Sequence, residues 1–139
     1  MNAEYNKKLV ADMYVALNTK NLDAHDKYWH QDMIWHGPPG FGDIHGLENF
    51  IEQVMKPFYV AFPDYHVEND IVVADSTWAS ATGYLTGTHK GTYLDIEPTG
   101  KPIKMQFSDF WLIKDGKFSE NFVMVDNYAV LQQMGIKFK

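Results

Sequence analysis

The spacing of apolar residues changes once along this chain, and the change limits the folds that the chain can adopt. Between residues 3 and 18, apolar side chains such as Leu9 and Met13 recur every four positions, which is typical of a helix with one buried face. A second stripe with helical spacing covers residues 47–62. After Pro63 the spacing drops to two residues, as in strands. Helices first and strands afterwards predict an α+β domain, with the helices on one face of a curved antiparallel sheet.

Shorter elements can be placed from turn and capping residues. We expect Asn21 to cap a short second helix that reaches Trp29. Pro57 has no N–H group and should kink the helix over residues 47–62. Residues 32–43 combine a brief strand-like run with a loop rich in proline and glycine, which we expect to line a site. The predicted strands then cover residues 67–73, 78–88, 103–113 and 118–126, and a short helix over 128–134 closes the chain.

Charge and composition exclude several classes of function. The 139 residues correspond to one domain over residues 1–139, and 45% of them are hydrophobic. There is no cysteine, and the 12 basic residues, all lysines, are outnumbered by 18 acidic ones. A negative chain without arginine is poorly suited to bind nucleic acid, and disulfides and thiolate metal sites are ruled out. No signal peptide or membrane-spanning segment is evident, so we expect a soluble cytoplasmic protein with a small ligand.

Asp109 is the first candidate for chemistry. It lies in the middle of a predicted strand, between Phe107 and Trp111, where aspartate is depleted. Burial would raise the pKa of its carboxyl group and suit it to proton transfer. The alternative interpretation is a structural carboxylate that accepts hydrogen bonds from its surroundings.

The residues around Asp109 depend on the turn that joins the last two strands. A three-residue loop with a bulge places Asn121 opposite Asp109. A two-residue turn at Asp115-Gly116 instead places Phe122 opposite Asp109, and brings Asp126 onto the same face. Asp126 also has a structural alternative, because it could cap the closing helix. In the first register the residues on the face of Asp109 are Met105, Phe107, Trp111, Val123 and Val125.

Histidines and aromatic residues supply the remaining candidates. His36 stands where the first strand meets the loop, and it could orient a substrate oxygen, move a proton or simply bond to the backbone. His89 lies between Gly87 and Gly91, which let the backbone bend at the end of the sheet, and it could close the mouth of a pocket or pack the bend. No HExxH or similar ligand pattern is present, so we predict no metal site. The predicted ligand-binding residues, which could equally be core, are Trp35, Phe41, Phe62, Trp78, His89, Phe107, Trp111 and Val123; Tyr65 and Tyr84 are further plausible lining.

Several segments together resemble the SnoaL-like polyketide cyclase family of the NTF2-like superfamily. They are WHGP at 35–38, PFYVAFPD at 57–64, GTHKG at 87–91, PTGK at 98–101, SDFW followed by KDGKFSEN, and LQQMG near the C-terminus. The resemblance implies a cone formed by a bent sheet and helices around an apolar cavity, often in a homodimer. It also implies ring closure by aldol condensation without a cofactor, with a carboxylate as acid and base.

The sequence departs from the family pattern at one position. Many relatives carry an acidic residue three positions after the glutamate of the last strand, and here that position is Val123. Asp109 could therefore do the proton transfer alone, Asp126 could substitute for the missing acid, or ring closure is not the activity.

These observations lead to two hypotheses of different classes. In the first, a pocket binds a small hydrophobic carbonyl compound, Asp109 moves a proton next to the carbonyl group, and His36 or Asn121 donates a hydrogen bond to the enolate, with no cofactor. In the second, the protein is a non-catalytic ligand-binding or interaction module, which Val123 favours. Hydrolysis or dehydration in the same pocket is a third option. The expected partners are a small molecule and a second copy of the chain, without nucleic acid or membrane.

Overall fold

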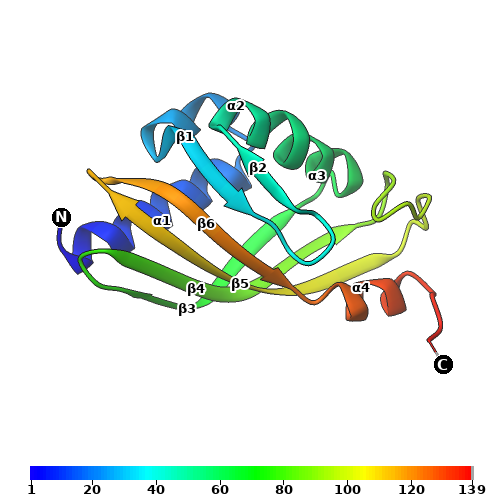
Figure 1. Cartoon of the computed structure of the whole chain (residues 1–139). Coiled ribbons are helices and arrows are strands. Elements are labelled where there is room, and N and C mark those ends of the chain that lie inside the picture. The colour runs from blue at the N-terminus through cyan, green and yellow to red at the C-terminus, as the bar shows by residue number, and fades with distance from the viewer. Residues whose placement is uncertain (139) are drawn as a thin grey trace.

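The computed structural model describes residues 1–138 (Figure 1). Its helical segments are α1 (Ala3–Asn18), the 3₁₀ helix η1 (Leu22–Lys27), α2 (Leu47–Phe50), the π-helical segment η2 (Ile51–Met55), α3 (Lys56–Ala61) and α4 (Asn127–Gln133). Its strands are β1 (Trp29–His36), β2 (Asp43–His45), β3 (His66–Ala74), β4 (Trp78–Thr88), β5 (Pro102–Lys114) and β6 (Lys117–Val125). Within residues 1–138, no helix is both long and apolar enough to cross a bilayer.

The predicted α+β cone is confirmed, with one difference in the sheet. The six strands follow the order β2-β1-β6-β5-β4-β3, and every pair is antiparallel except β1 and β6, which run parallel. The expectation of a fully antiparallel sheet is therefore wrong at this pair. Because β1 and β6 are far apart in the sequence, no hairpin turn dictates their relative direction. Figure 1 shows α1 and the α2–η2–α3 segment on the concave side of the curved sheet.

The helix over residues 47–61 contains a wide turn where Pro57 disturbs it. The irregularity expected at this proline takes the form of η2, which ends at Met55, directly before α3. A proline cannot donate the usual helical hydrogen bond and its ring crowds the preceding turn, and π turns accommodate such disturbances. The helix ends at Ala61 and Phe62 is its C-cap, because Pro63 disfavours a helical conformation at the residue before it.

The second predicted helix is shorter than expected, and its cap is absent. The side chain of Asn21 makes no capping hydrogen bond with η1. Trp29 does not belong to the helix, because it is buried and pairs with Phe118 as the first residue of β1. Burial of the indole against the sheet outweighs the local helical signal.

The turn between β5 and β6 explains why neither predicted register was right. Asp115 and Gly116 both have positive φ angles, of 50° and 77°, as a two-residue hairpin turn requires. A bulge at Ser119 then shifts the pairing by one residue, between the Ile113–Phe118 and Leu112–Glu120 pairs.

The bulge places Val123 opposite Asp109, and Asn121 opposite Trp111. The two-residue turn, one of the two alternatives, is the one present, whereas neither alternative gave the residue opposite Asp109. A shift of one residue in the pairing moves every side chain of β6 to the other face of the sheet. With the bulge, the β6 side chains therefore lie on the faces predicted for the three-residue loop. Asp109 and Asn121 therefore share the concave face of the sheet, as that alternative expected.

Candidate active site

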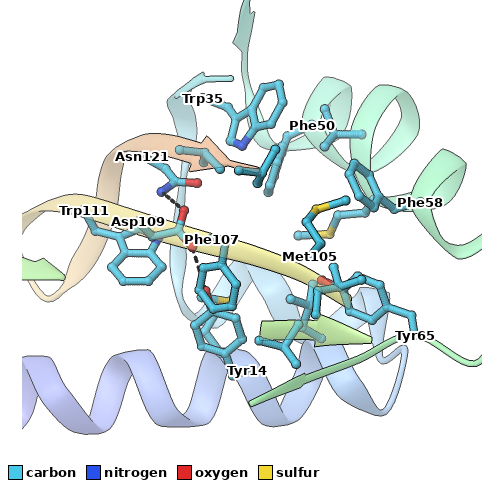
Figure 2. A pocket seen from close by; sticks show the side chains of 18 of the residues that line it. Tyr14, Trp35, Phe50, Phe58, Tyr65, Met105, Phe107, Asp109, Trp111 and Asn121 are labelled. Atoms are coloured by element: carbon cyan, nitrogen blue, oxygen red, sulfur yellow. Dashed lines mark hydrogen bonds between the residues drawn. The ribbon is translucent and has the colours of Figure 1, made fainter. Parts of the chain in front are cut away.

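A cavity of about 120 Å³ lies between the concave face of the sheet and the helices that cover it (Figure 2). Its volume is close to that of the apolar cavity of about 150 Å³ that holds benzene in another protein, so a ligand of roughly one ring fits it. Its lining residues are Met13, Tyr14, Leu17, Trp29, Trp35, Phe50, Val54, Met55, Phe58, Tyr59, Tyr65, Val67, Leu85, Met105, Phe107, Asp109, Trp111, Asn121, Val123 and Val125. Asp109 is the one acidic residue in this lining.

The strand pattern of β5 explains why a carboxylate faces the cavity. Alternate residues of β5 are buried, and Asp109 falls in the same series as Phe107 and Trp111. The Asp109 side chain consequently points to the concave face, and the residue is only 7% exposed. The charge is thus held among apolar side chains, away from water.

Both oxygens of Asp109 accept hydrogen bonds (Figure 2). The Tyr14 hydroxyl donates to Oδ2 at 2.8 Å, and the Asn121 side-chain amide donates to Oδ1 at 3.1 Å. Burial raises the pKa of the Asp109 carboxyl from 3.8 to about 6, while the hydrogen bonds from Asn121 and Tyr14 lower it. A group with such a pKa can accept and return a proton near neutral pH.

Two tyrosines of the cavity stay protonated across the physiological range. Burial, followed by the nearby charge of Asp109, raises the pKa of the Tyr14 hydroxyl well above 10. Burial also raises the pKa of the Tyr65 hydroxyl well above 10. Neither hydroxyl group can therefore act as a base near neutral pH; the Tyr14 hydroxyl donates to Asp109, and the Tyr65 hydroxyl keeps a proton that it can donate.

Asn121 is brought to Asp109, but its amide protons are already in use. Nδ2 donates to the backbone carbonyl of Phe110 at 3.1 Å in addition to Asp109. The side-chain oxygen of Asn121 is turned toward the cavity in Figure 2. Asn121 thus positions the carboxylate, and it cannot donate to a ligand without giving up one of these bonds.

His36 is not in the cavity, so its expected place beside Asp109 is wrong. Successive residues of β1 point to opposite faces, and Trp35 takes the inward position. The imidazole of His36 lies on the outer face, stacked on Phe122 with ring centroids 4.4 Å apart. Its Nδ1 lies 3.0 Å from Asp43 and its Nε2 3.4 Å from Glu120.

Asp126 follows its structural alternative rather than the catalytic one. It is the N-cap of α4, where its side chain accepts a hydrogen bond of 3.0 Å from the Ala129 N–H group. It is not among the residues that line the cavity. The chain turns into α4 directly after β6, and this takes the carboxylate away from the concave face.

The other predicted ligand-binding residues divide into two groups. Trp35, Phe107, Trp111 and Val123 line the cavity, whereas Phe41, Phe62, Trp78 and His89 do not. The ring of Phe41 packs against Trp35. Phe62 and His89 are fully buried and pack against each other, with ring centroids 6.0 Å apart. Trp78 is 38% exposed, on the outer face of the sheet. Packing between elements decides these positions, and residue type alone does not.

Tyr14 contacts Asp109 directly but is not among the site residues predicted from the sequence. It belongs to the buried face of α1, and its ring packs edge-on against Trp111 with centroids 6.0 Å apart. A tyrosine on an otherwise apolar helical stripe is the available signal, since a buried hydroxyl group needs a hydrogen-bond partner. Within residues 1–138, no three His, Asp or Glu side chains gather closely enough to hold a metal ion.

The fold and the cavity agree with the comparison of the sequence to known families. The sequence profile of the SnoaL-like polyketide cyclases matches residues 8–134, so this chain belongs to that family. No curated protein sequence matches the chain significantly.

Solved structures show the same fold at low sequence identity. IdmH from Streptomyces antibioticus, a proposed polyketide cyclase, is 24% identical, with a TM-score of 0.81 over 93% of this chain and 97% of IdmH. A proposed SnoaL-like polyketide cyclase from Jannaschia sp. CCS1 is 16% identical, with a TM-score of 0.88 over 98% of this chain and 95% of that one. AclR from Streptomyces galilaeus, a proposed hydroxylase, is 22% identical, with a TM-score of 0.80 over 93% and 94% of the two chains. Since these neighbours carry different proposed activities, the shared fold does not fix the reaction.

Proposed function

We propose that this protein binds a small hydrophobic carbonyl compound in the cavity and that Asp109 removes a proton from the carbon next to the carbonyl group. The observation that carries the proposal is a single buried carboxylate in a mainly apolar cavity, with a pKa raised to about 6. A base of this kind is poised for proton transfer near neutral pH, and an apolar cavity favours a neutral, ring-sized substrate.

The chemistry requires only a proton and an electron pair to move. The Asp109 carboxylate takes the proton, and the electrons of the C–H bond form an enolate. Return of the proton to another carbon gives an isomer. Attack of the enolate carbon on a second carbonyl group of the same molecule forms a C–C bond, and Asp109 then protonates the new alkoxide. Tyr14 and Asn121 hold the carboxylate in place throughout.

Val123 makes Asp109 responsible for both proton transfers. Val123 lies directly opposite Asp109 on β6, at the position where the sequence analysis expects an acid in many relatives. An acid there would form a carboxylate pair with Asp109. With valine, one carboxyl group must act first as base and then as acid, which suits isomerisation or aldol ring closure on one molecule.

Proton exchange from a simple ketone tests the proposal. In heavy water at pH 7, the protein should accelerate loss of the α-proton signals of cyclohexanone or a similar single-ring ketone, followed by NMR. Asp109→Asn should abolish the acceleration. Asp126→Asn is the matched control, because asparagine caps a helix as well as aspartate does and residue 126 is outside the cavity. Full exchange by Asp109→Asn would overturn the proposal.

A non-catalytic binding module is the second candidate function. The observation that favours it is the complete pairing of Asp109, since both carboxylate oxygens already accept hydrogen bonds inside the protein. The same experiment separates the two functions. A binding module would broaden or shift the ketone signals without exchanging its protons.

We also propose that the outer face of the sheet joins two copies of the chain. The strand register places Val73, Ser80, Phe110 and Phe122 in one row across four strands. The large apolar side chains exposed on these strands are Ile71, Val73, Trp78, Phe110, Phe122 and Met124. A mainly apolar patch of this kind on the exposed face of a sheet is typical of a surface that is covered by a partner, and a symmetric dimer would bury the same patch on both copies.

A further inference from the structure

The indole of Trp35 carries a hydrogen-bond donor that has no partner among the described residues. Trp35 is 5% exposed and lines the cavity. No hydrogen bond is formed by its Nε1 within residues 1–138, and Figure 2 shows this nitrogen on the side of the ring that faces the cavity. Buried indole N–H groups usually find a partner, and an indole nitrogen can only donate. A group that forms a hydrogen bond with this N–H group must therefore be an acceptor.

The other donors of the cavity are committed elsewhere or covered. The Tyr14 hydroxyl donates to Asp109, and the Tyr59 hydroxyl donates to the Leu17 carbonyl at 2.7 Å. The Nε1 atoms of Trp29 and Trp111 also have no partner within residues 1–138, but they are completely buried by packing and are not open to a ligand.

Among the lining residues that the structure describes, only the Tyr65 hydroxyl competes with Trp35 for a ligand oxygen. It makes no hydrogen bond with another described residue. A hydroxyl group rotates and can also accept, so its requirement for a partner is less specific than that of an indole. The two donors can be separated by experiment.

The packing around Trp35 fixes the direction of its N–H group. The ring lies against Phe50 and Phe41, with centroids 5.8 and 6.2 Å away. The far edge of the indole fills the space beside Gly37, where a Cβ atom would lie only 2.4 Å from Trp35 Cζ3. A donor held in this way needs little reorganisation when charge develops next to it.

The strand register relates this donor to Asp109. Trp35 on β1 pairs with Asn121 on β6, and Asn121 in turn contacts Asp109 on β5. The donor and the base therefore flank Asn121 on the concave face. A single-ring ligand has room to reach both groups in the cavity of about 120 Å³.

We propose that the Trp35 N–H group donates a hydrogen bond to the carbonyl oxygen of the ligand and stabilises the negative oxygen of the enolate. This inference rests on the proposed function and replaces the donor role that the sequence analysis gave to His36 or Asn121. It names the ligand class as a single-ring compound with one oxygen directed toward β1 and an acidic C–H bond directed toward Asp109.

The first test uses 4-nitrophenolate as a probe of a negative oxygen on a ring. The protein carries Asp109→Asn, because an amide imitates the protonated carboxyl group and does not repel the probe. With ¹⁵N-labelled tryptophan, the sequence provides four indole N–H signals. Saturation with probe should move the Trp35 signal downfield and leave that of Trp78, on the outer face, unchanged. A Trp35 signal that stays in place while the probe binds overturns the proposal.

The second test compares Trp35→Phe with Tyr65→Phe in the same Asp109→Asn background. Loss of a hydrogen bond to a charged oxygen should weaken phenolate binding by about 10-fold or more in Trp35→Phe. Tyr65→Phe should change it by less than about 3-fold. The reverse order would assign the donor to Tyr65 and overturn the proposal.

The two tests also separate this inference from the proposed function. Both measure binding, so they remain decisive if no ketone undergoes proton exchange. If exchange occurs and requires Asp109, but the phenolate does not contact Trp35, the inference about the donor alone is wrong.

Discussion

The two faces of the β5–β6 hairpin reverse the usual distribution of side chains. On the concave face, Asp109 and Asn121 are buried among apolar residues. On the outer face, Phe110 and Phe122 pair across the strands and are exposed. A buried charge costs stability unless it is paired, and exposed aromatic rows promote association. Each face thus carries residues that stability alone does not favour, and each is therefore a place to look for function.

The largest effect should come from removing the charge on the inner face. Asp109→Asn keeps the shape and both hydrogen-bonding neighbours, but it removes the base. We expect the rate of ketone proton exchange to fall by about 10²- to 10⁴-fold, the range typical of a lost acid–base group. NMR in heavy water measures the rate. A matching substitution on the outer face, Phe110→Leu, should leave the exchange rate within about 2-fold of the unmodified protein, so the measurement compares the two faces directly.

Adding charge to the outer face should weaken the association of two copies of the chain. Phe110→Lys together with Phe122→Lys places two cations in the apolar row, and we expect the dimer to weaken by at least about 100-fold, since unpaired charges are costly in an interface core. Sedimentation velocity across a concentration series measures the association. If the unmodified chain is monomeric at high concentration, the proposal for this face is wrong. Exchange activity should survive the double substitution if the two faces work independently.

The pH dependence of stability should report the buried carboxyl group of Asp109 on the concave face. The pKa of Asp109 is near 3.8 in the unfolded chain and about 6 in the folded protein, so the folded protein binds more protons between these values. The contribution of Asp109 to the free energy of unfolding is therefore fully present below pH 3.8 and is lost as the pH rises through 6. The loss amounts to about 3 kcal/mol. Urea unfolding of the unmodified protein and Asp109→Asn at several pH values should show their difference changing by this amount, and a constant difference would contradict it.

The smallest effect should come from the partner of the carboxylate. The hydrogen bond from Tyr14 to Asp109 Oδ2 lowers the pKa of the Asp109 carboxyl group, and Tyr14→Phe removes this bond. The pKa of Asp109 should therefore rise further above 6, and unfolding should become easier by about 1 kcal/mol. The pH profile of proton exchange should shift to higher pH, because the reaction needs the carboxylate. An unchanged profile would mean that Tyr14 does not control the base.

The main features of the fold follow from the sequence because they depend on local patterns. The four-residue spacing around Leu9 and Met13 predicted α1 with the bounds that the structure has. The two-residue spacing gave β4 over Trp78–Thr88. The parallel pairing of β1 with β6 did not follow, because it joins distant segments and no turn residue encodes it.

The candidate site was predictable in part for the same reason. Asp109 could be selected because a charged residue stood out in an apolar strand, and alternation placed it on the correct face. Its neighbours depend on the bulge at Ser119, which no turn signal marks. The side chain of Trp35 points inward, and His36, as the next residue of the same strand, therefore points to the outer face and not to the predicted site. Tyr14 reaches Asp109 from α1, a contact between residues far apart in the sequence.

The titration of the Asp109 carboxyl group is the most direct test of its role as the base. Its carbon resonance, assigned by its absence in Asp109→Asn, should be followed by NMR from pH 3 to pH 9. We expect a midpoint near pH 6, because a desolvated carboxyl group holds its proton well above the usual pKa of 3.8. A midpoint at or below 3.8 would identify a hydrated or purely structural carboxylate and would contradict the role of Asp109 as the base.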